Sequence, residues 1–597
     1  MIIKKIFHNS FQYLSFFYRY LGYRIFIAFG LSLLVGILDG VGLAMFIPLI
    51  KMLSTGETST LGGEGDFISE FVIQELGINA SLVNIFLLIF LFFSLKGIAK
   101  FLESYTRVIF QQKFIRSIRI NTIDLLNSYD FKHFLKADSG RIQNTLGGEV
   151  NRINAAYIFY FKAIQFGVLV LVYVILALGA DWKFTLLVVA GGAFINIIFR
   201  YLYKRTKYFS RKFTSQSHIF QNLLVQNVHL FKYLKATGSN IFYGNKLKEN
   251  IGGMEITQKR IGLVDAFLGA IREPLTILVV FGAIFFQMYF FDEVMGSILL
   301  SLVLLYRGIT FFMAMQEQFN YFLGVSGSLE NMEAFTKELQ TGKERNGSQK
   351  FEKFIEKLEF KSLSFEFEKG DPVLQNIDLT IYKNETLAII GESGSGKSTL
   401  LNIISGLLLP TQGSYSIDHK QIEHLNLASF KRRIGYIVQD ATIFNDTIYN
   451  NISFWDPKTP ENLTRFQKAI EKAAIQDFIE GLPEKEETIL GSNGINISGG
   501  QKQRLSIARE LYKEVDILLM DEATSALDGE TEAAIQYNIN KLKGEFTIVI
   551  IAHRLSTVKN ADRIILMKKG EIEAEGKFDE LLKKSNQFKE MVNLQNL

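Results

Sequence analysis

The sequence contains no cysteine, only 7 prolines among 597 residues, and a charged fraction of 21%. The missing cysteines exclude disulfide bonds, thiolate metal sites and a cysteine nucleophile. Lys and Arg exceed Asp and Glu by only 65 − 60 = 5, which excludes a dedicated nucleic-acid binder. Hydrophobic residues make up 48% of the chain, and 53 residues are phenylalanine. This composition excludes intrinsic disorder and indicates a membrane portion.

Long apolar runs occupy the first half of the chain. Residues 25–50 read IFIAFGLSLLVGILDGVGLAMFIPLI, long enough at about 1.5 Å per residue to cross a hydrocarbon layer of about 30 Å. This run is too long for a signal peptide and lacks a small-residue cleavage site. The aromatic segment before it fits either a helix at the membrane surface or an extension of the first span. Five further runs complete a predicted set of six spans, near residues 81–102, 157–179, 183–201, 268–291 and 294–323.

The charges between these runs predict an orientation, because Lys and Arg near span ends are retained in the cytoplasm. The N-terminal segment and the loops after spans two and four are basic, whereas the loop after span one is acidic. The short turns GADWK and FDEVMG fit outside hairpins. We therefore expect an integral membrane protein of the bacterial inner membrane with both termini and the second half in the cytoplasm.

The composition changes near residue 340. A polar segment without an apolar face follows, and then β-branched runs such as TLAIIG and FTIVIIAH alternate with helical segments, which is typical of a parallel sheet covered by helices. The predicted fold class is a six-helix, all-α membrane domain fused to a soluble α/β domain with a phosphate-binding loop. The predicted boundaries are 1–340 for the membrane domain, 341–354 for the linker and 355–597 for the α/β domain.

A glycine-rich loop with the sequence GESGSGKS lies between a predicted strand and a predicted helix. Backbone N–H groups of such a loop surround phosphate oxygens at a helix N-terminus. Lys397 would pair with the β- and γ-phosphates, and Ser398 would hold Mg²⁺ through its hydroxyl. The flanking strand and helix disfavour a chance glycine-rich turn. The predicted phosphate-binding residues are Gly391, Glu392, Ser393, Gly394, Ser395, Gly396, Lys397, Ser398 and Thr399.

Two acidic residues end the apolar strand ILLMDE, at the carboxyl edge where α/β proteins bind ligands. Asp521 would orient the metal through water, and Glu522 would accept a proton from the attacking water. Solvated loop carboxylates are the alternative interpretation of this pair taken alone.

Further motifs in a fixed order make the second half similar to the ATP-binding cassette (ABC) family. Residues 497–501, ISGGQ, resemble the family's signature sequence, Gln439 its Q-loop, residues 525–528, SALD, its D-loop, and His553 its switch histidine. The resemblance covers about residues 355–590. The six-span half resembles the exporter type of ABC transporter, and two cytoplasmic segments, 128–153 and 217–238, resemble the coupling segments of exporters. Alternatively, these segments are plain helical extensions of the spans. In the second segment, we expect residues 220–227 to make the contact between the membrane half and the cassette half.

This resemblance implies ATP and Mg²⁺ as cofactors and a homodimer in which each signature completes the partner's ATP site. Phe367 would stack on adenine. The implied catalytic residues are Glu522, His553 and Gln439, and the implied metal ligands are Ser398 and Gln439. Ser492 replaces a Glu common in exporter cassettes, which leaves the strength of domain coupling open. The other implied nucleotide-binding residues are Asp521, Ser498, Gly499, Gly500, Gln501 and Asp528.

The function implied is ATP-hydrolysing export or flipping of a lipid, a lipid-linked glycan or another amphipathic substrate. The segments LDGVGLAMFIPLI and LLYRGITFF resemble parts of lipid-linked oligosaccharide flippases. An ATP-gated channel or sensor and a peptide exporter are the alternatives; the intact catalytic set favours a pump.

Asp39 and Arg307 are the substrate candidates, because each charge lies near mid-membrane, where an unpaired charge is costly. We expect an ion pair of Asp39 with Arg307 or a similar partner, binding of an anionic lipid group by Arg307, or snorkelling.

Overall fold

The computed structural model describes residues 13–46, 49, 82–291, 295–491, 494, 496–521, 537, 540–552, 554 and 558–595. Internal contacts divide the chain into two compact units. Unit 1 contains residues 1–129 and 137–342, and unit 2 contains residues 130–136 and 343–597. The short segment 130–136 is therefore part of the unit that the second half of the chain forms, because most of its contacts are with that unit.

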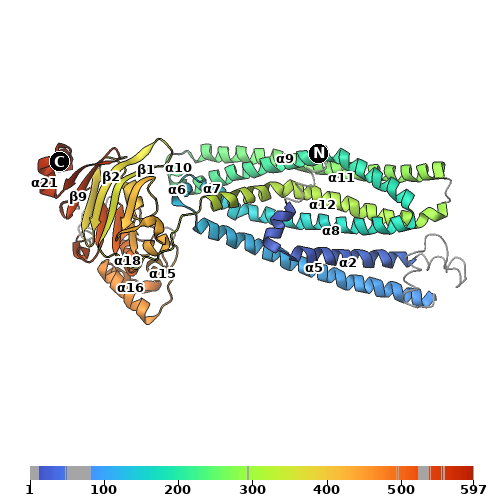
Figure 1. The fold of residues 1–597 in the computed structure, drawn as a ribbon, viewed down its shortest axis with the longest axis horizontal. Coiled ribbons are helices and arrows are strands. Elements are labelled where there is room, and N and C mark those ends of the chain that lie inside the picture. The colour runs from blue at the N-terminus through green and yellow to red at the C-terminus, as the bar shows by residue number, and fades with distance from the viewer. Residues whose placement is uncertain are drawn as a thin grey trace. The chain divides into compact units, whose positions relative to one another are not determined.

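Unit 1 is built from long helices (Figure 1). The helix α2 packs along α5, α8 along α12, and α9 along α11. Besides a helix over residues 13–21, the helices described in this unit are α2 (Arg24–Ala44), α5 (Leu82–Asn127), α7 (Ser139–Leu146), α8 (Gly148–Ala180), α9 (Trp182–His229), α10 (Phe231–Ala236), α11 (Asn240–Phe291) and α12 (Met295–Thr341).

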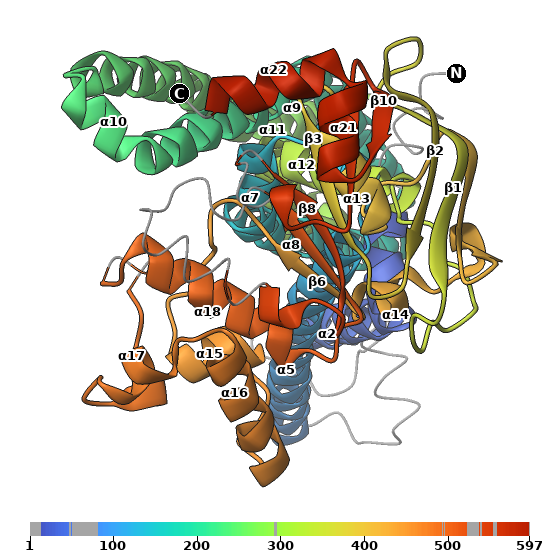
Figure 2. The same cartoon turned by 90° about the vertical axis from the view of Figure 1, so that its left-hand side faces the viewer.

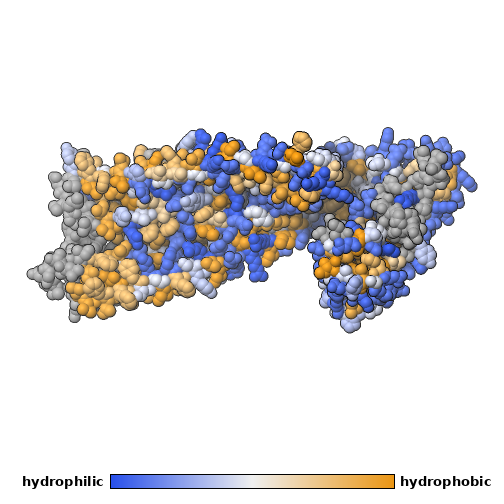
Figure 3. Space-filling view, turned by 180° about the vertical axis from the view of Figure 1, so that it is seen from behind, coloured by the Kyte–Doolittle hydropathy of each residue, from blue (hydrophilic) through white to orange (hydrophobic). Residues whose placement is uncertain are grey.

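Five segments among the described residues are long and apolar enough to cross a membrane, and they contain the first five predicted spans or most of each. The sixth predicted span falls in α12, which is helical from Met295. In Figure 3, hydrophobic side chains gather at the left-hand end of these helices, and hydrophilic ones gather along the middle of that face. The apolar segments are Arg24–Ala44, Leu82–Asn127, Ser139–Gly179, Trp182–His229 and Asn240–Gln287.

The aromatic segment before span one forms a helix of its own over residues 13–21. Gly22, with φ +59°, separates it from α2. Phe17 is fully buried and packs against Phe114 of α5 and Tyr160 of α8, with ring centroids 5.2 and 5.1 Å away. The segment is therefore not a continuation of the first span, because its aromatic face is part of the helical core.

Unit 2 contains two sheets. The larger has the order β10-β9-β3-β8-β7-β6, in which β9, β3, β8, β7 and β6 run parallel and β10 is antiparallel to β9. The strands β3, with TLAIIG, and β8, with TIVII, are buried at every position, as expected for strands covered on both faces. Its strands are β3 (Thr386–Gly391), β6 (Ile434–Ile437), β7 (Ile517–Asp521), β8 (Thr547–Ile551), β9 (Arg563–Lys568) and β10 (Glu571–Gly576).

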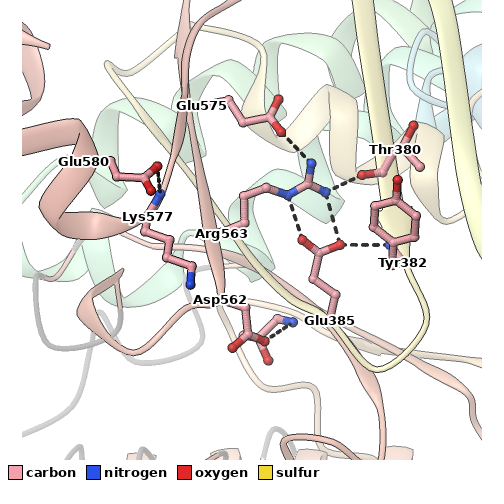
Figure 4. A network of polar contacts seen from close by, with 9 residues as sticks. Thr380, Tyr382, Glu385, Asp562, Arg563, Glu575, Lys577 and Glu580 are labelled. Atoms are coloured by element: carbon pink, nitrogen blue, oxygen red, sulfur yellow. Dashed lines mark hydrogen bonds and ion pairs between the residues drawn. The ribbon is translucent and has the colours of Figure 1, made fainter. Parts of the chain in front are cut away.

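The smaller sheet, with order β2-β1-β4-β5, is antiparallel and was not part of the sequence-based prediction. Its signal is the alternation in β1, where Leu358 and Phe360 point into the core and their neighbours are only partly buried. Arg563 of β9 ties the two sheets together, because it donates to Glu385 before β3 and to the Thr380 carbonyl of β2 (Figure 4). The strands are β1 (Lys357–Glu366), β2 (Pro372–Tyr382), β4 (Gln412–Ile417) and β5 (Lys420–Gln421).

The helices α15, α16, α17 and α18 form a group beside β6 (Figure 2). This group is held by α18, which contacts α15, α16 and β6. The helices of unit 2 are α6 (Phe131–Phe134), α13 (Lys397–Ile404), α14 (Leu427–Lys431), α15 (Ile448–Ser453), α16 (Pro460–Lys472), α17 (Gln476–Glu480), α18 (Gly499–Tyr512), α21 (Phe578–Lys584) and α22 (Asn586–Gln595), with 3-10 turns at Ile422–His424 and Lys485–Glu487.

Candidate functional site

The predicted nucleotide-binding residues gather at one edge of the parallel sheet. Gly391 is the last residue of β3, Asp521 is the last residue of β7, and Gln439 follows β6 by two residues. Because β3, β8, β7 and β6 are parallel, their carboxyl ends share one edge. This edge is where open α/β sheets bind ligands.

The phosphate-binding loop has a backbone that only glycine fits at two positions. Gly391 has φ +147°, and a Cβ there would clash with the Met567 carbonyl oxygen. Gly396 has φ +98°, caps α13 without a side chain, and leaves no room for a Cβ beside Leu374. The first N–H groups of α13 are therefore available to an anion.

Two polar side chains of this loop fit a phosphate. The Ser395 hydroxyl is buried and has no hydrogen-bond partner among the described residues. The Lys397 ammonium is also buried and donates to the carbonyls of Gly391 and Glu392, at 2.9 and 2.8 Å. Unpartnered buried hydroxyls are rare. The loop therefore offers a hydroxyl, a cation and helix N–H groups to a polyphosphate.

The donor set also fits Mg²⁺ bound together with phosphates. Among the described residues no cluster of three or more His, Asp and Glu side chains could hold a metal alone. Mg²⁺ commonly takes one or two protein ligands and completes its shell with phosphate oxygens and water. Ser398 at the start of α13, Gln439 and Asp521 are oxygen donors of this kind.

Phe367 lies directly after β1 and is half-buried. Its ring packs edge-on against Phe365, with centroids 4.9 Å apart. A ring fixed in this way by its neighbour can offer a face to a base.

The signature sequence begins α18. Ser498 caps this helix: its hydroxyl accepts from the Gln501 N–H at 3.3 Å, and its own N–H donates to the Gln501 side chain at 2.8 Å. Gly499 has open space where a Cβ would be. The helix α18 packs on the edge strand β6, and the phosphate-binding loop follows β3. Two strands, β8 and β7, lie between β3 and β6 in the sheet order and separate the two motifs.

Glu522, the D-loop at residues 525–528 with Asp528, His553 and Ser492 lie outside the described residues. Glu522 directly follows β7, and His553 follows the end of β8 by two residues. Their roles stay predictions.

Arg509 of α18 is a residue that the motif analysis missed. It is buried and donates to the Asn451 and Thr442 carbonyls at 2.6 and 2.7 Å. Burial lowers the pKa of this guanidinium, which nevertheless stays charged. Asn451 in turn donates to the Phe444 carbonyl at 2.9 Å. Arg509 thereby fixes the segment after the Q-loop to the helix that begins with the signature. The signal available from the sequence was an Arg within KQRLSIAREL, the helical run that follows the signature.

The short helix α6, in the first predicted coupling segment, contacts the strand that leads to Phe367. Lys132 donates to the Glu366 carbonyl at 2.8 Å and lies 5.2 Å from the Phe365 ring centroid. Lys136 forms a 2.9 Å ion pair with Glu368, and this hydrogen bond lowers the pKa of the Glu368 carboxyl.

The second coupling segment is helical throughout most of its length. Residues 220–227 lie within the continuous helix α9, and the short separate helix is α10. Contact at residues 220–227 stays a prediction.

The two substrate candidates line one cavity of about 440 Å³ in unit 1, between α2, α5, α8 and α12. Asp39 is buried and forms a 2.6 Å ion pair with Lys96 of α5. The predicted ion pair of Asp39 is therefore confirmed with a similar partner, Lys96, and not with Arg307. Arg307 lies over the Phe311 ring, with its guanidinium carbon 5.6 Å from the centroid. The sequence pattern could not show whether Lys96 or Arg307 pairs with Asp39, because both cations lie on other spans; Lys96 is 57 residues away in sequence.

Glu103 of α5 is a second buried carboxylate beside this cavity, and the sequence analysis did not identify it. It accepts from the Ser32 hydroxyl at 2.6 Å, from Lys100 at 2.7 Å and from the Gln165 amide at 3.0 Å. The Gln165 side-chain oxygen accepts a hydrogen bond from Arg107 at 3.0 Å. The cavity wall is thus a connected network of polar groups within apolar helices.

Comparisons with known proteins agree with both units. The ABC transporter family model matches residues 374–525. The chain is 30% identical over 514 residues to the ATP-dependent lipid A-core flippase of Hahella chejuensis, covering 84% of this chain and 86% of that protein. It is 28% identical over 524 residues to the Pasteurella multocida protein of the same name, covering 84% and 87%.

The fold is similar to that of a bacterial Atm1-family ABC exporter solved with ATP bound. The TM-score is 0.79 at 22% sequence identity, covering 97% of this chain and 99% of that one. The chain is an integral membrane protein that belongs to the ABC transporter family, as an ATP-hydrolysing exporter or flippase with a membrane domain and an ATP-binding cassette fused in one polypeptide.

Proposed function

We propose that two copies of this chain form a flippase that uses ATP to move an amphipathic lipid through the cavity of unit 1. The observation that carries this proposal is the cavity itself. Its wall combines charged side chains with the apolar side chains of Val35, Phe166, Leu169 and Phe311. A head group needs the polar part of such a wall, and a hydrocarbon chain needs the apolar part. The names of the relatives, which are lipid A-core flippases, support a lipid as the substrate.

The ATP sites would be shared between the two copies. The signature and the phosphate-binding loop are separated within one chain by two strands of the sheet order, β8 and β7. Ser498, Gly499, Gly500 and Gln501 of one copy would therefore complete the site that Lys397 and its loop form in the other.

Exposed apolar side chains at the tip between α9 and α10 also support the proposal that two copies of the chain associate. Leu230, Phe231 and Tyr233 are exposed there, with 47%, 55% and 64% of each residue accessible in the single chain. Exposed apolar groups at one tip indicate a contact surface. This tip would dock on the cassette of the partner subunit.

Hydrolysis would proceed by in-line attack of water on the γ-phosphate of ATP. Glu522 would accept a proton from that water, and His553 and Gln439 would orient the reacting groups. Lys397 and the α13 N–H groups would stabilise the phosphate charge, and Phe367 would hold the adenine. Mg²⁺, held by Ser398 and Gln439 with Asp521 through water, would supply charge neutralisation.

The protein would lie in the bacterial inner membrane, with both termini and the cassette in the cytoplasm. The basic segments before α2 and between α5 and α8 support this orientation.

A crosslink tests the shared site directly, because the chain has no cysteine background. The double variant Ser395→Cys/Ser498→Cys should form a disulfide between two chains when ATP is bound. Crosslinking within one chain only, in folded protein, would contradict the shared site.

Liposomes distinguish a flippase from the alternative ATP-gated channel. A flippase moves a labelled lipid only while ATP is hydrolysed. A channel would conduct ions with ATP bound in Glu522→Gln, where hydrolysis is blocked.

A further inference from the structure

A tyrosine of the edge strand β6 joins that strand to the helix that follows the phosphate-binding loop. The Tyr436 hydroxyl donates to the side-chain oxygen of Asn402 in α13 at 3.0 Å. The Tyr436 ring packs against the hydrophobic cluster that contains Leu401 of α13 and Leu519 of β7. Tyr436 therefore lies between the large sheet and α13.

The position of this contact follows from the periods of the helix and the strands. Ser398 and Asn402 are four residues apart on α13, so their side chains lie on one face of the helix, one turn apart. Tyr436 is paired with Leu519 of β7, and Asp521 lies two residues further along β7, on the same face of the sheet. This contact therefore forms the layer directly below Ser398 and Asp521.

The Tyr436 hydroxyl lies within the electrostatic reach of Asp521. Burial raises the pKa of this hydroxyl, and the Asp521 carboxylate raises it further. The hydroxyl is therefore protonated at physiological pH and remains a donor to Asn402. The backbone N–H of Tyr436 also donates to the buried carboxylate of Glu510 in α18, at 3.2 Å. Tyr436 is thus held by α13 through its side chain and by the signature helix through its backbone.

The proposed metal donors come from two different elements. Ser398 belongs to α13 and Asp521 to β7, so the placement of the helix on the sheet sets the distance between these side chains. Mg²⁺ demands near-octahedral geometry with ligands at about 2.0–2.1 Å. Apolar contacts such as those of Leu401 hold the helix on the sheet but have no direction, whereas a hydrogen bond does. The hydrogen bond of Tyr436 therefore restricts sliding of α13 next to the metal donors.

We propose that Tyr436 is a positioning residue: through Asn402 it holds the metal donors of α13 and β7 at the separation that Mg²⁺ requires when it binds with ATP. The inference rests on the metal site of the proposed function. It adds a residue outside the nucleotide-binding motifs, which acts through its neighbour and not on the nucleotide itself.

The test compares nucleotide binding with and without Mg²⁺ in the full-length protein. A fluorescent, non-hydrolysable ATP analogue is titrated in EDTA and in excess Mg²⁺. Tyr436→Phe removes only the hydroxyl. We expect the affinity in Mg²⁺ to fall about fivefold, as for the loss of one hydrogen bond, and the affinity in EDTA to change less than about twofold. Equal losses in both conditions, or no loss in either, would overturn the inference.

Asn402→Ala tests the same contact from its other end and should give the same loss in Mg²⁺. The double variant Tyr436→Phe/Asn402→Ala should lose no more than either single variant, because all three break one contact. Losses that multiply in the double variant would show that the two residues act independently and would overturn the inference.

Tyr415→Phe is the matched control, because it removes a tyrosine hydroxyl bound to the other end of the same helix. The Tyr415 hydroxyl donates to the Ile404 carbonyl, the last residue of α13, at 2.8 Å. Thermal stability should fall in this variant, while the ratio of affinities in Mg²⁺ and EDTA should stay that of the wild type. A change in this ratio as large as in Tyr436→Phe would mean that any weakening of α13 has the effect, and would overturn the inference.

Ser398→Ala separates failure of the inference from failure of the proposed metal site. If Ser398→Ala weakens binding in Mg²⁺ while Tyr436→Phe does not, the metal site stands and the inference falls. If Ser398→Ala keeps the wild-type dependence on Mg²⁺, the proposed metal site itself fails, and the inference falls with it.

Discussion

Two arginines, one in each unit, differ in how their charge is matched. In unit 2, Arg563 donates to both oxygens of Glu385 at 2.7 and 3.1 Å and to Glu575 at 2.5 Å (Figure 4). In unit 1, Arg307 lines a cavity without a carboxylate partner among the described residues. The first arrangement joins strands of a fixed core, whereas the second leaves Arg307 beside the cavity through which we propose that the substrate moves. A charge that is matched within the chain holds elements together, and a charge without a carboxylate partner can take part in binding.

The largest expected effect comes from the catalytic edge of unit 2. Glu522→Gln should lower ATP hydrolysis by about 10² to 10⁴, because the variant removes the proton acceptor for the attacking water. ATP binding should persist, since the phosphate-binding loop is unchanged. Phosphate release and nucleotide binding, measured on the same sample, check this. Hydrolysis at the wild-type rate would show that another residue is the base.

Breaking a matched charge in unit 1 should destabilise the protein. Asp39→Ala leaves Lys96 without its 2.6 Å partner and should cost about 3 kcal/mol of stability. The double variant Asp39→Ala/Lys96→Met should recover part of the loss, because no uncompensated charge remains. Thermal unfolding in detergent compares the two variants. Equal Tm values for both would mean that the pair is not a stabilising contact.

Lys397, the cation of the phosphate-binding loop in unit 2, should determine ATP affinity. Lys397→Ala removes a charge-assisted contact to the phosphates worth about 1.5 to 3 kcal/mol, so ATP affinity should fall roughly 10- to 100-fold. Lys420→Ala, on the exposed strand β5, is the matched control and should bind ATP normally. Titration with a fluorescent ATP analogue measures both. Unchanged affinity in Lys397→Ala would place the phosphates elsewhere.

The smallest effect is expected at α6. Lys132→Ala should lower lipid-stimulated ATP hydrolysis about twofold, because Lys132 holds the strand before Phe367 through the Glu366 carbonyl. Lys136→Ala should change it less, since the Lys136–Glu368 pair is exposed. A larger effect of Lys136→Ala would reverse the roles of the two contacts.

The Lys136 contact also has a defined pH range. Lys136 lowers the pKa of Glu368, so the ion pair is present above the ordinary Glu pKa and is lost only as the pH falls through the lowered value. The effect of Lys136→Ala should therefore be the same at pH 6 and pH 8. ATPase assays at both pH values check this.

Much of unit 2 could be predicted because its signals are local. The apolar strand, the glycine loop and the helix around Lys397 follow each other within a few residues, and the structure has them as β3, the loop and α13. The antiparallel sheet was missed because its strands pair across distant segments, as Leu358 does with Ile417.

The cavity of unit 1 could not be predicted in the same way. The spans were found from hydropathy, but hydropathy does not tell which face of one helix meets which face of another. Lys96, Lys100 and Glu103 lie on one helix, and their grouping with Asp39 and Gln165 arises only when α2 and α8 pack against α5.

The most direct test of the account measures ATP hydrolysis and lipid translocation in the same proteoliposomes. We predict that a labelled lipid crosses the bilayer in proportion to ATP hydrolysed by the wild-type dimer, and that Glu522→Gln stops both. Continued ATP hydrolysis by the wild type without translocation of any lipid offered, or translocation by Glu522→Gln at the wild-type rate, would contradict the account.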